Sequence, residues 1–172
     1  MSETVKKLKR SALLHYLDTS FDTSTEIASV SWFLIGKDVE DMSVELNPNV
    51  TQKKNILDET SVEDEGYEPS FDVDTYFADP SDGAFYEKIK DIAMNRRTGD
   101  ECKTRILEVL IDKATGSFDA WVEDVVIKPQ SYGGAQGGVR IPYNVSFCGN
   151  RQKGSVTITD KKPTFTVETK TE

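Results

Sequence analysis

The sequence contains few of the residues on which catalytic and metal-binding sites depend. Among 172 residues it has one histidine, His15, and two cysteines, Cys102 and Cys148. His15 lies between the apolar residues Leu14 and Tyr16, and no Gly-x-Ser-x-Gly elbow accompanies it, so a structural role is favoured over a Ser-His-Asp triad. The cysteines have no metal-ligand spacing and are predicted to be reduced thiols of a cytosolic protein. We therefore predict that the chain is not an enzyme and has no catalytic, metal or cofactor-binding residue.

Long apolar runs and nucleotide-binding motifs are missing as well. The apolar patch at residues 12–17 is short and is interrupted by His15, so neither a signal peptide nor a membrane span is expected. The glycine-rich segment 133–138 lacks the Lys-Ser/Thr pair of a phosphate-binding loop, and it precedes a predicted strand where that loop would precede a helix. Membrane partners and nucleotide cofactors are therefore not predicted.

Positive charge is also scarce. Thirty acidic residues against twenty-one basic ones give a net charge of -9, which disfavours tight binding to nucleic acid. Residues 55–87 contain eleven acids and no lysine or arginine. Such a run is expected to stay extended until a partner or counter-ions organise it. Calcium is an alternative, since Asp72 and Asp74 are suitable oxygen ligands, but the twelve-residue calcium loop is absent and a solvated acidic face is preferred.

The strongest structural pattern lies in residues 139–147, where every second residue is apolar. This alternation predicts a strand with one buried face, whose core residues are Val139, Ile141, Tyr143, Val145 and Phe147. Glycines form a loop before it, and residues 149–154 are predicted to turn into a second strand at 155–159.

Further strands are predicted at residues 11–20, 26–36, 39–46, 103–113 and 118–128. The strands at 103–113 and 118–128 are apolar on both faces, which suggested burial against another subunit. One helix is predicted, with Asp79 as N-cap, an apolar stripe and an end near Gly99; the stripe is Phe85, Ile89, Ile92 and Ala93. The predicted fold is mainly β, a β-sandwich or partly open barrel with one flanking α-helix.

Four segments in a fixed order carry a family resemblance. They are KRSALLHYLDTS at residues 9–20, WFLIGKDVEDMSVELNPNVTQKKNIL at 32–57, EDEGYEPSFDVDTYF at 63–77 and SYGGAQGGVRIPYNVSFCGN at 131–150, with the predicted helix between the last two. This arrangement covers almost the whole chain. It resembles the major tail tube proteins of siphophages that infect Gram-positive bacteria.

The resemblance implies one tail-tube domain over residues 1–172, with an N-terminal arm (1–25), a long acidic loop (47–78) and a C-terminal tail (160–172). It implies hexameric rings that stack into a tube, through which genomic double-stranded DNA passes in transit. The implied partners are further copies of the chain and the tape-measure, tail terminator and baseplate proteins. The implied location is the virion tail, assembled in the bacterial host cytoplasm.

The loop at 47–78 resembles the family's loop that reaches a neighbouring subunit or ring. The resemblance places inter-subunit contacts at Asn47, Pro48, Asn49, Thr51, Gln52 and Tyr67. Acidic residues expected in this loop or facing the lumen are Asp58, Glu59, Glu63, Asp64 and Glu65. Asp58 departs from the pattern, because a small turn residue such as glycine is expected there.

Two other functions remain open at this stage. The chain could be the tube subunit of a contractile phage-like particle, which would use the same fold. It could also be a monomeric β-sandwich binding or adhesion module, which would expose a cluster of aromatic side chains; the candidates are Trp32, Trp121 and Tyr132.

Overall fold

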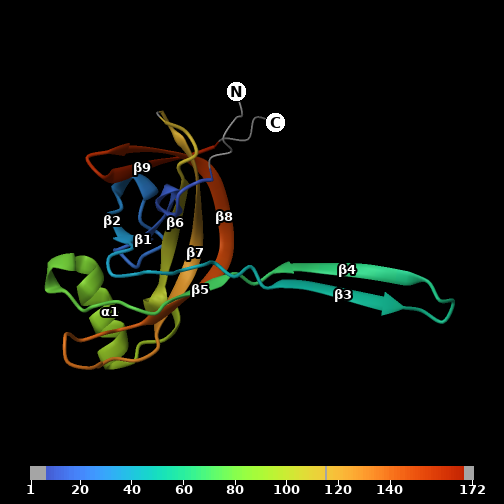
Figure 1. The fold of residues 1–172 in the computed structure, drawn as a ribbon, viewed down its shortest axis with the longest axis horizontal. Coiled ribbons are helices and arrows are strands. Elements are labelled where there is room, and N and C mark those ends of the chain that lie inside the picture. Colours follow the sequence, from blue (N-terminus) through green and yellow to red (C-terminus); the bar gives the residue numbers. More distant parts are fainter. Residues whose placement is uncertain (1–6, 115, 169–172) are drawn as a thin grey trace.

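A single antiparallel sheet, curled into a half-barrel, forms the body of the protein (Figure 1). The computed structural model describes residues 7–114 and 116–168. Seven strands form the sheet in the order β2-β1-β6-β7-β8-β5, and β9 pairs with β8 outside this path. Their bounds are β1 Leu13–Asp18, β2 Trp32–Ile35, β5 Ser70–Val73, β6 Lys103–Leu110, β7 Phe118–Pro129, β8 Tyr143–Thr159 and β9 Lys162–Val167. The prediction of a mainly β, partly open barrel with one flanking helix is confirmed.

The central strands β6 and β7 are covered on both faces by the chain itself. On β6, Ile106 belongs to one buried cluster, which includes the helix residues, whereas Leu107 and Val109 belong to a second cluster on the opposite face. The second cluster also contains Phe165 of β9, because the curl brings β9 over this face. The inference that a second subunit covers these strands was therefore wrong: the curl and the helix bury both faces within one copy.

The helix forms over its predicted apolar stripe, but Asp79 caps a 3-10 turn before it and Gly83 is the N-cap of the helix itself. A short 3-10 turn, η3 (Pro80–Asp82), leads into α1 (Ala84–Asn95). Asp79 accepts hydrogen bonds from the Ser81 amide at 2.9 Å and the Ser81 hydroxyl at 2.7 Å, which satisfies an otherwise unpaired amide. The helix ends before Gly99, because Arg96 takes the left-handed conformation at φ 51°. The predicted stripe is buried against the sheet: Phe85, Ile89, Ile92 and Ala93.

The strand predicted at 139–147 begins later and runs further. Val139 is 53% exposed, and Ile141 is buried but precedes the strand. Pro142 has no amide hydrogen for the ladder, which explains why β8 begins only at Tyr143. Tyr143 and Val145 are fully buried.

The turn predicted at 149–154 is instead an irregularity within one strand. Gly149 and Asn150 have φ values of 100° and 58°, and the pairing of β8 with β7 shifts register at this point. The strand bends there and continues to Thr159. Below the bend β8 pairs with β5, and above it β8 pairs with β9.

Both predicted terminal appendages contribute strands to the sheet. The segment predicted as an N-terminal arm, 1–25, contains β1, which lies inside the sheet between β2 and β6 and matches the strand predicted at 11–20. Its side chains Tyr16 and Leu17 are buried, which stabilises this position. The tail at 160–172 contains β9, whereas residues 1–6 and 169–172 lie outside the described part of the chain.

The strands predicted at 26–36 and 39–46 are shorter than expected. The first is a 3-10 turn, η2 (Ile27–Ser29), followed by β2. In the second only Glu45 pairs, in an isolated bridge to Ser70. This segment crosses from β2 toward β5, and Met42 anchors it in the core. It therefore lacks a continuous strand neighbour along most of its length.

Candidate assembly surface

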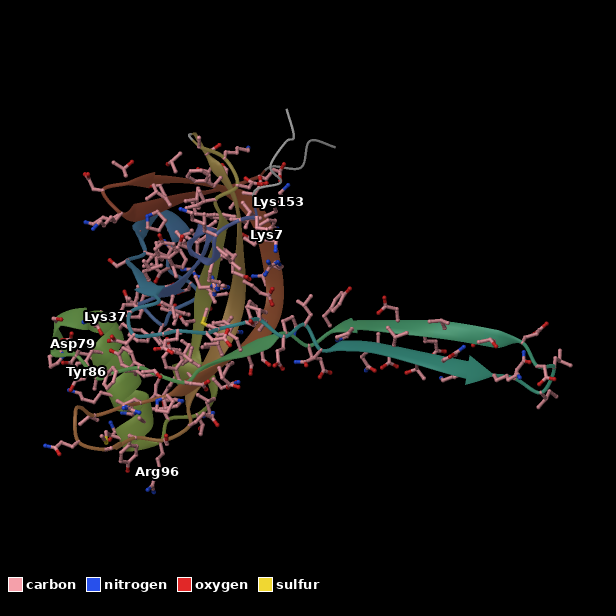
Figure 2. All side chains as sticks on the ribbon, viewed as in Figure 1. Lys7, Lys37, Asp79, Tyr86, Arg96 and Lys153 are labelled. Atoms are coloured by element: carbon pink, nitrogen blue, oxygen red, sulfur yellow. The ribbon has the colours of Figure 1, made fainter. Side chains whose placement is uncertain are left out.

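A hairpin separate from the main sheet projects from the body (Figure 1). It consists of β3 (Pro48–Lys54) and β4 (Thr60–Tyr67), and we call residues 48–67 the arm. The arm lies within the acidic loop predicted at 47–78, which was expected to stay extended until a partner or counter-ions organise it; here its two strands pair with each other. In Figure 2 its side chains extend into solvent along both sides of the ribbon.

Side-chain hydrogen bonds close the tip of the arm. The side-chain oxygen of Asn55 accepts from the amides of Leu57 at 2.9 Å and Glu59 at 3.0 Å, which fixes a tight turn. Asp58 has φ 60° in this turn, the left-handed conformation for which glycine was expected. Asp tolerates this conformation better than most residues, so the departure from the family pattern leaves the turn intact.

Antiparallel pairing brings lysines to the acidic residues of the arm. Lys53 lies 3.0 Å from Glu63 and Lys54 lies 3.4 Å from Asp58, while Asn49 donates to Glu65 at 2.6 Å. All the acidic site candidates lie on the arm and are exposed: Asp58, Glu59, Glu63, Asp64 and Glu65. The charge repulsion expected for 55–87 is therefore reduced by Lys53 and Lys54, which lie just outside that segment.

The predicted contact residues gather at the base and along one strand of the arm. Asn47 has φ 44° and donates to the Glu68 carbonyl at 3.0 Å, which holds the base together. Pro48 pairs with Tyr67 at the first rung of the arm. The remaining three lie on β3: Asn49, Thr51 and Gln52.

The arm also exposes apolar side chains. Val50 and Val62 lie on the same face of the arm, where they are 57% and 64% exposed. They share this face because Val62 pairs with Gln52, which lies two residues after Val50 on β3. At the tip, Ile56 is fully exposed and Leu57 is 71% exposed. A two-stranded hairpin is marginally stable alone, and clustered exposed apolar residues mark contact sites. The arm therefore has the composition of a docking element.

The curled sheet ends in open edges. Among the described residues, β2 pairs on one side only, with β1. Strand β5 pairs with β8, and on its other side only Ser70 is paired, in the isolated bridge to Glu45. Open edges present unpaired backbone groups that favour pairing with another chain. The sheet thus offers one open edge at its β2 end and another at its β5 end, beside the arm.

Polar side chains inside the body form structural networks. Asp18 is fully buried and pairs with Arg105 at 3.0 Å, and the Thr104 hydroxyl donates to the Asp18 carbonyl. Sequence patterning missed this pair, because both residues lie at strand positions with no distinguishing motif.

The residue His15 is buried, with 2% of its surface exposed, as expected for a structural role. Its Nε2 lies 3.3 Å from Glu108, close enough for an ion pair but without hydrogen-bond geometry. Burial alone would raise the pKa of Glu108, but interactions with His15 and Arg151 lower it. Cys102 is buried and Cys148 exposed, and both are free thiols.

Within residues 7–114 and 116–168 there is no group of three or more His, Cys, Asp or Glu side chains placed to hold a metal ion. In the same part of the chain no helix has the length and apolar character needed to cross a membrane. The prominent surface features are thus the arm and the open sheet edges.

Comparison with known proteins identifies structural neighbours only. No family model matches the chain, and no curated protein matches it in sequence. The SPP1 tail tube is similar in structure, with a TM-score of 0.53 and 13% identity over 90% of this chain and 82% of that chain. A sheath/tube terminator of the PVC extracellular contractile injection system has a TM-score of 0.52 and 8% identity over 88% of this chain and 99% of that chain. The fold is therefore tail-tube-like, and these neighbours are structural proteins rather than enzymes.

Proposed function

We propose that this chain is a structural subunit of a phage tail tube, which self-assembles into stacked hexameric rings that enclose a channel for DNA. The observation that carries the proposal is the combination of a tail-tube-like fold with an arm that has no partner within its own copy. Almost every arm residue is exposed, and none belongs to either core cluster. A second copy would supply the surface that the arm lacks.

The open sheet edges provide the second element of assembly. Pairing of the β2 end of one copy with the β5 end of the next would make a heterologous interface, which closes into a ring when the rotation between copies permits. Closure removes exposed edges, and this limits open-ended aggregation. In this arrangement the arm reaches a neighbouring copy of the same or the adjacent ring, in the virion tail.

The charge of the chain suits passage of DNA rather than its capture. A net charge of -9 repels phosphates, so a channel built from this chain would allow DNA to slide without sticking. The arm acids would contribute to this repulsion if they face the lumen. If they face another copy, they would define the charge that the receiving surface must complement.

A tube terminator of a contractile particle is the second candidate, because the terminator neighbour is covered over 99% of its length. A terminator would form one ring and stop, whereas a tube subunit would stack rings. A monomeric binding module is less favoured. Of its three candidate aromatic residues only Tyr132 is exposed, at 52%. Trp32 and Trp121 are partly exposed, and the guanidinium of Arg151 lies over the Trp121 ring at 5.6 Å.

Size-exclusion chromatography with light scattering, at low and high protein concentration, tests the proposal. A subunit of 19.2 kDa predicts a hexamer of about 115 kDa (six times 19.2), with larger species as the concentration rises. A terminator would give the hexamer alone at every concentration. A monomer at every concentration, in low and in physiological salt, would contradict self-assembly and favour the binding module.

A further inference from the structure

A groove lies at the β2 end of the strand order. Its volume is about 320 Å³, and it is lined by β1, β2 and the segment that follows β2. Leu34 at its rim is 45% exposed, although it lies on an open edge strand. The apolar side chains that line the groove are Leu13, Leu14, Leu34, Ile35, Val39 and Met42.

Positive charge borders this groove. Arg10 lines it and donates to the carbonyls of Leu13 at 2.9 Å and Met42 at 3.0 Å. No carboxylate of the described residues forms an ion pair with Arg10, although Glu40 also lines the groove. Lys9 is exposed beside Arg10. A ligand that combines an apolar side chain with negative charge would complement such a surface.

The tip of the arm has this combination. Ile56 and Leu57 are the apolar residues of the tip, and Asp58 and Glu59 follow them directly. Two bulky side chains match a cavity of this size, and burying them would remove the largest exposed apolar surface of the arm.

The groove and the arm belong to different ends of the strand order, although the curl of the sheet brings the His15 ring of the groove within 5.6 Å of the Phe71 ring on β5. The groove lies at the β2 end of the sheet, whereas the arm leads into β5 at the opposite end (Figure 1). In a heterologous ring or stack, the β5 side of one copy faces the β2 side of another. The seven residues of β3 span about 23 Å at about 3.3 Å each, so the tip can reach past its own body.

We propose that the arm tip of one copy inserts Ile56 and Leu57 into the groove between β1, β2 and residues 36–42 of a neighbouring copy. This inference rests on the proposed self-assembly and names the surface that receives the arm. Asp58 and Glu59 then lie near Arg10 and Lys9 of that neighbour. A second hollow, of about 370 Å³ at the base of the arm, fits less well. Its one arginine, Arg151, already pairs with Glu108 at 2.9 Å and Glu123 at 3.2 Å, which line the same hollow, so it offers an acidic tip no unpaired positive charge.

A cysteine pair tests the contact directly. The variant carries Ile56→Cys and Leu34→Cys in a Cys148→Ser background, in which Cys102 stays buried. Because the arm points away from β2 within one copy, a disulfide between these positions forms only between copies (Figure 1). Mild oxidation is expected to give a ladder of covalent oligomers on non-reducing gels. The control places the second cysteine at Val139 instead of Leu34 and should remain monomeric on the gel.

Charge substitutions provide an independent measurement. Ile56→Asp and Leu34→Asp are each expected to raise the concentration needed for assembly at least about tenfold, with circular dichroism unchanged. Mixing the two variants should give 1:1 dimers, because each supplies the intact surface that the other lacks. Val139→Asp is the matched control, since Val139 is similarly exposed but lies elsewhere.

The outcomes separate this inference from the proposed function. If the wild type assembles while both variants assemble at the wild-type concentration and no ladder forms, the docking site is wrong and the tube subunit stands. A wild type that stays monomeric at every concentration would overturn both.

Discussion

Removing the arm should leave the body folded and abolish assembly. In the variant, residues 49–66 are replaced by Asn-Gly, which joins the paired residues Pro48 and Tyr67 through a two-residue hairpin turn. No side chain of the removed segment belongs to either core cluster, so the body keeps its buried apolar surface.

The expected change in stability follows from loop length. Shortening this connection from eighteen residues (49 to 66 inclusive) to two is about three halvings, each worth about 0.6 kcal/mol of loop-closure entropy. The hairpin contributes little stability of its own, since two-stranded hairpins are marginal. The free energy of unfolding should therefore stay the same or rise by up to about 2 kcal/mol.

Urea denaturation followed by circular dichroism measures this free energy, and size-exclusion chromatography measures assembly. The account expects a stable monomer that does not assemble. A loss of more than about 1 kcal/mol would show that the arm supports the body, and assembly at the wild-type concentration would show that the arm is not an assembly element.

Three further predictions concern the body. Arg105→Ala should lower the free energy of unfolding by about 3 to 5 kcal/mol, because it leaves the buried carboxylate of Asp18 without its partner; a loss below about 1 kcal/mol in urea denaturation would contradict this. Tyr143→Phe should be neutral or stabilising by about 1 kcal/mol, since the Tyr143 hydroxyl is buried without a hydrogen-bond partner, and a lower melting temperature would point to a partner for it. Hydrogen bonds from Ser81, and the nearby Lys37, lower the pKa of Asp79 to about 2 from its usual 3.8. Because the pKa of Asp79 is lower in the folded than in the unfolded state, its contribution to stability is complete above about pH 4 and is lost as the pH falls through 2. The NMR chemical shift of the Ser81 amide should therefore change with a titration midpoint at about pH 2. The variant Asp79→Asn should show no such change.

Local patterns in the sequence predicted those elements whose side chains pack against a continuous face. The stripe from Phe85 to Ala93 and the apolar runs of β6 and β7 are examples, because burial and period coincide there. Boundaries failed where a backbone feature competed with the pattern. Pro142 delays β8, and the bend at Gly149 continues a strand where a turn was expected.

The arm shows what a sequence read segment by segment omits. The acidic run appeared unable to fold alone, yet cross-strand pairing brings Lys53 to Glu63 and lets Asn55 close the turn. These contacts depend on register, which composition does not specify. The groove lined by Leu34 could not be predicted either, since it is formed by strands β1 and β2 together with the crossing segment at 36–42.

Negative-stain electron microscopy of the purified wild-type protein tests the central claim most directly. The account predicts hollow rings with six-fold symmetry that stack into tubes at high concentration, and their loss in the variant lacking residues 49–66. Uniform single particles of about 19 kDa at every concentration, from protein with a folded circular dichroism spectrum, would contradict the tube-subunit account.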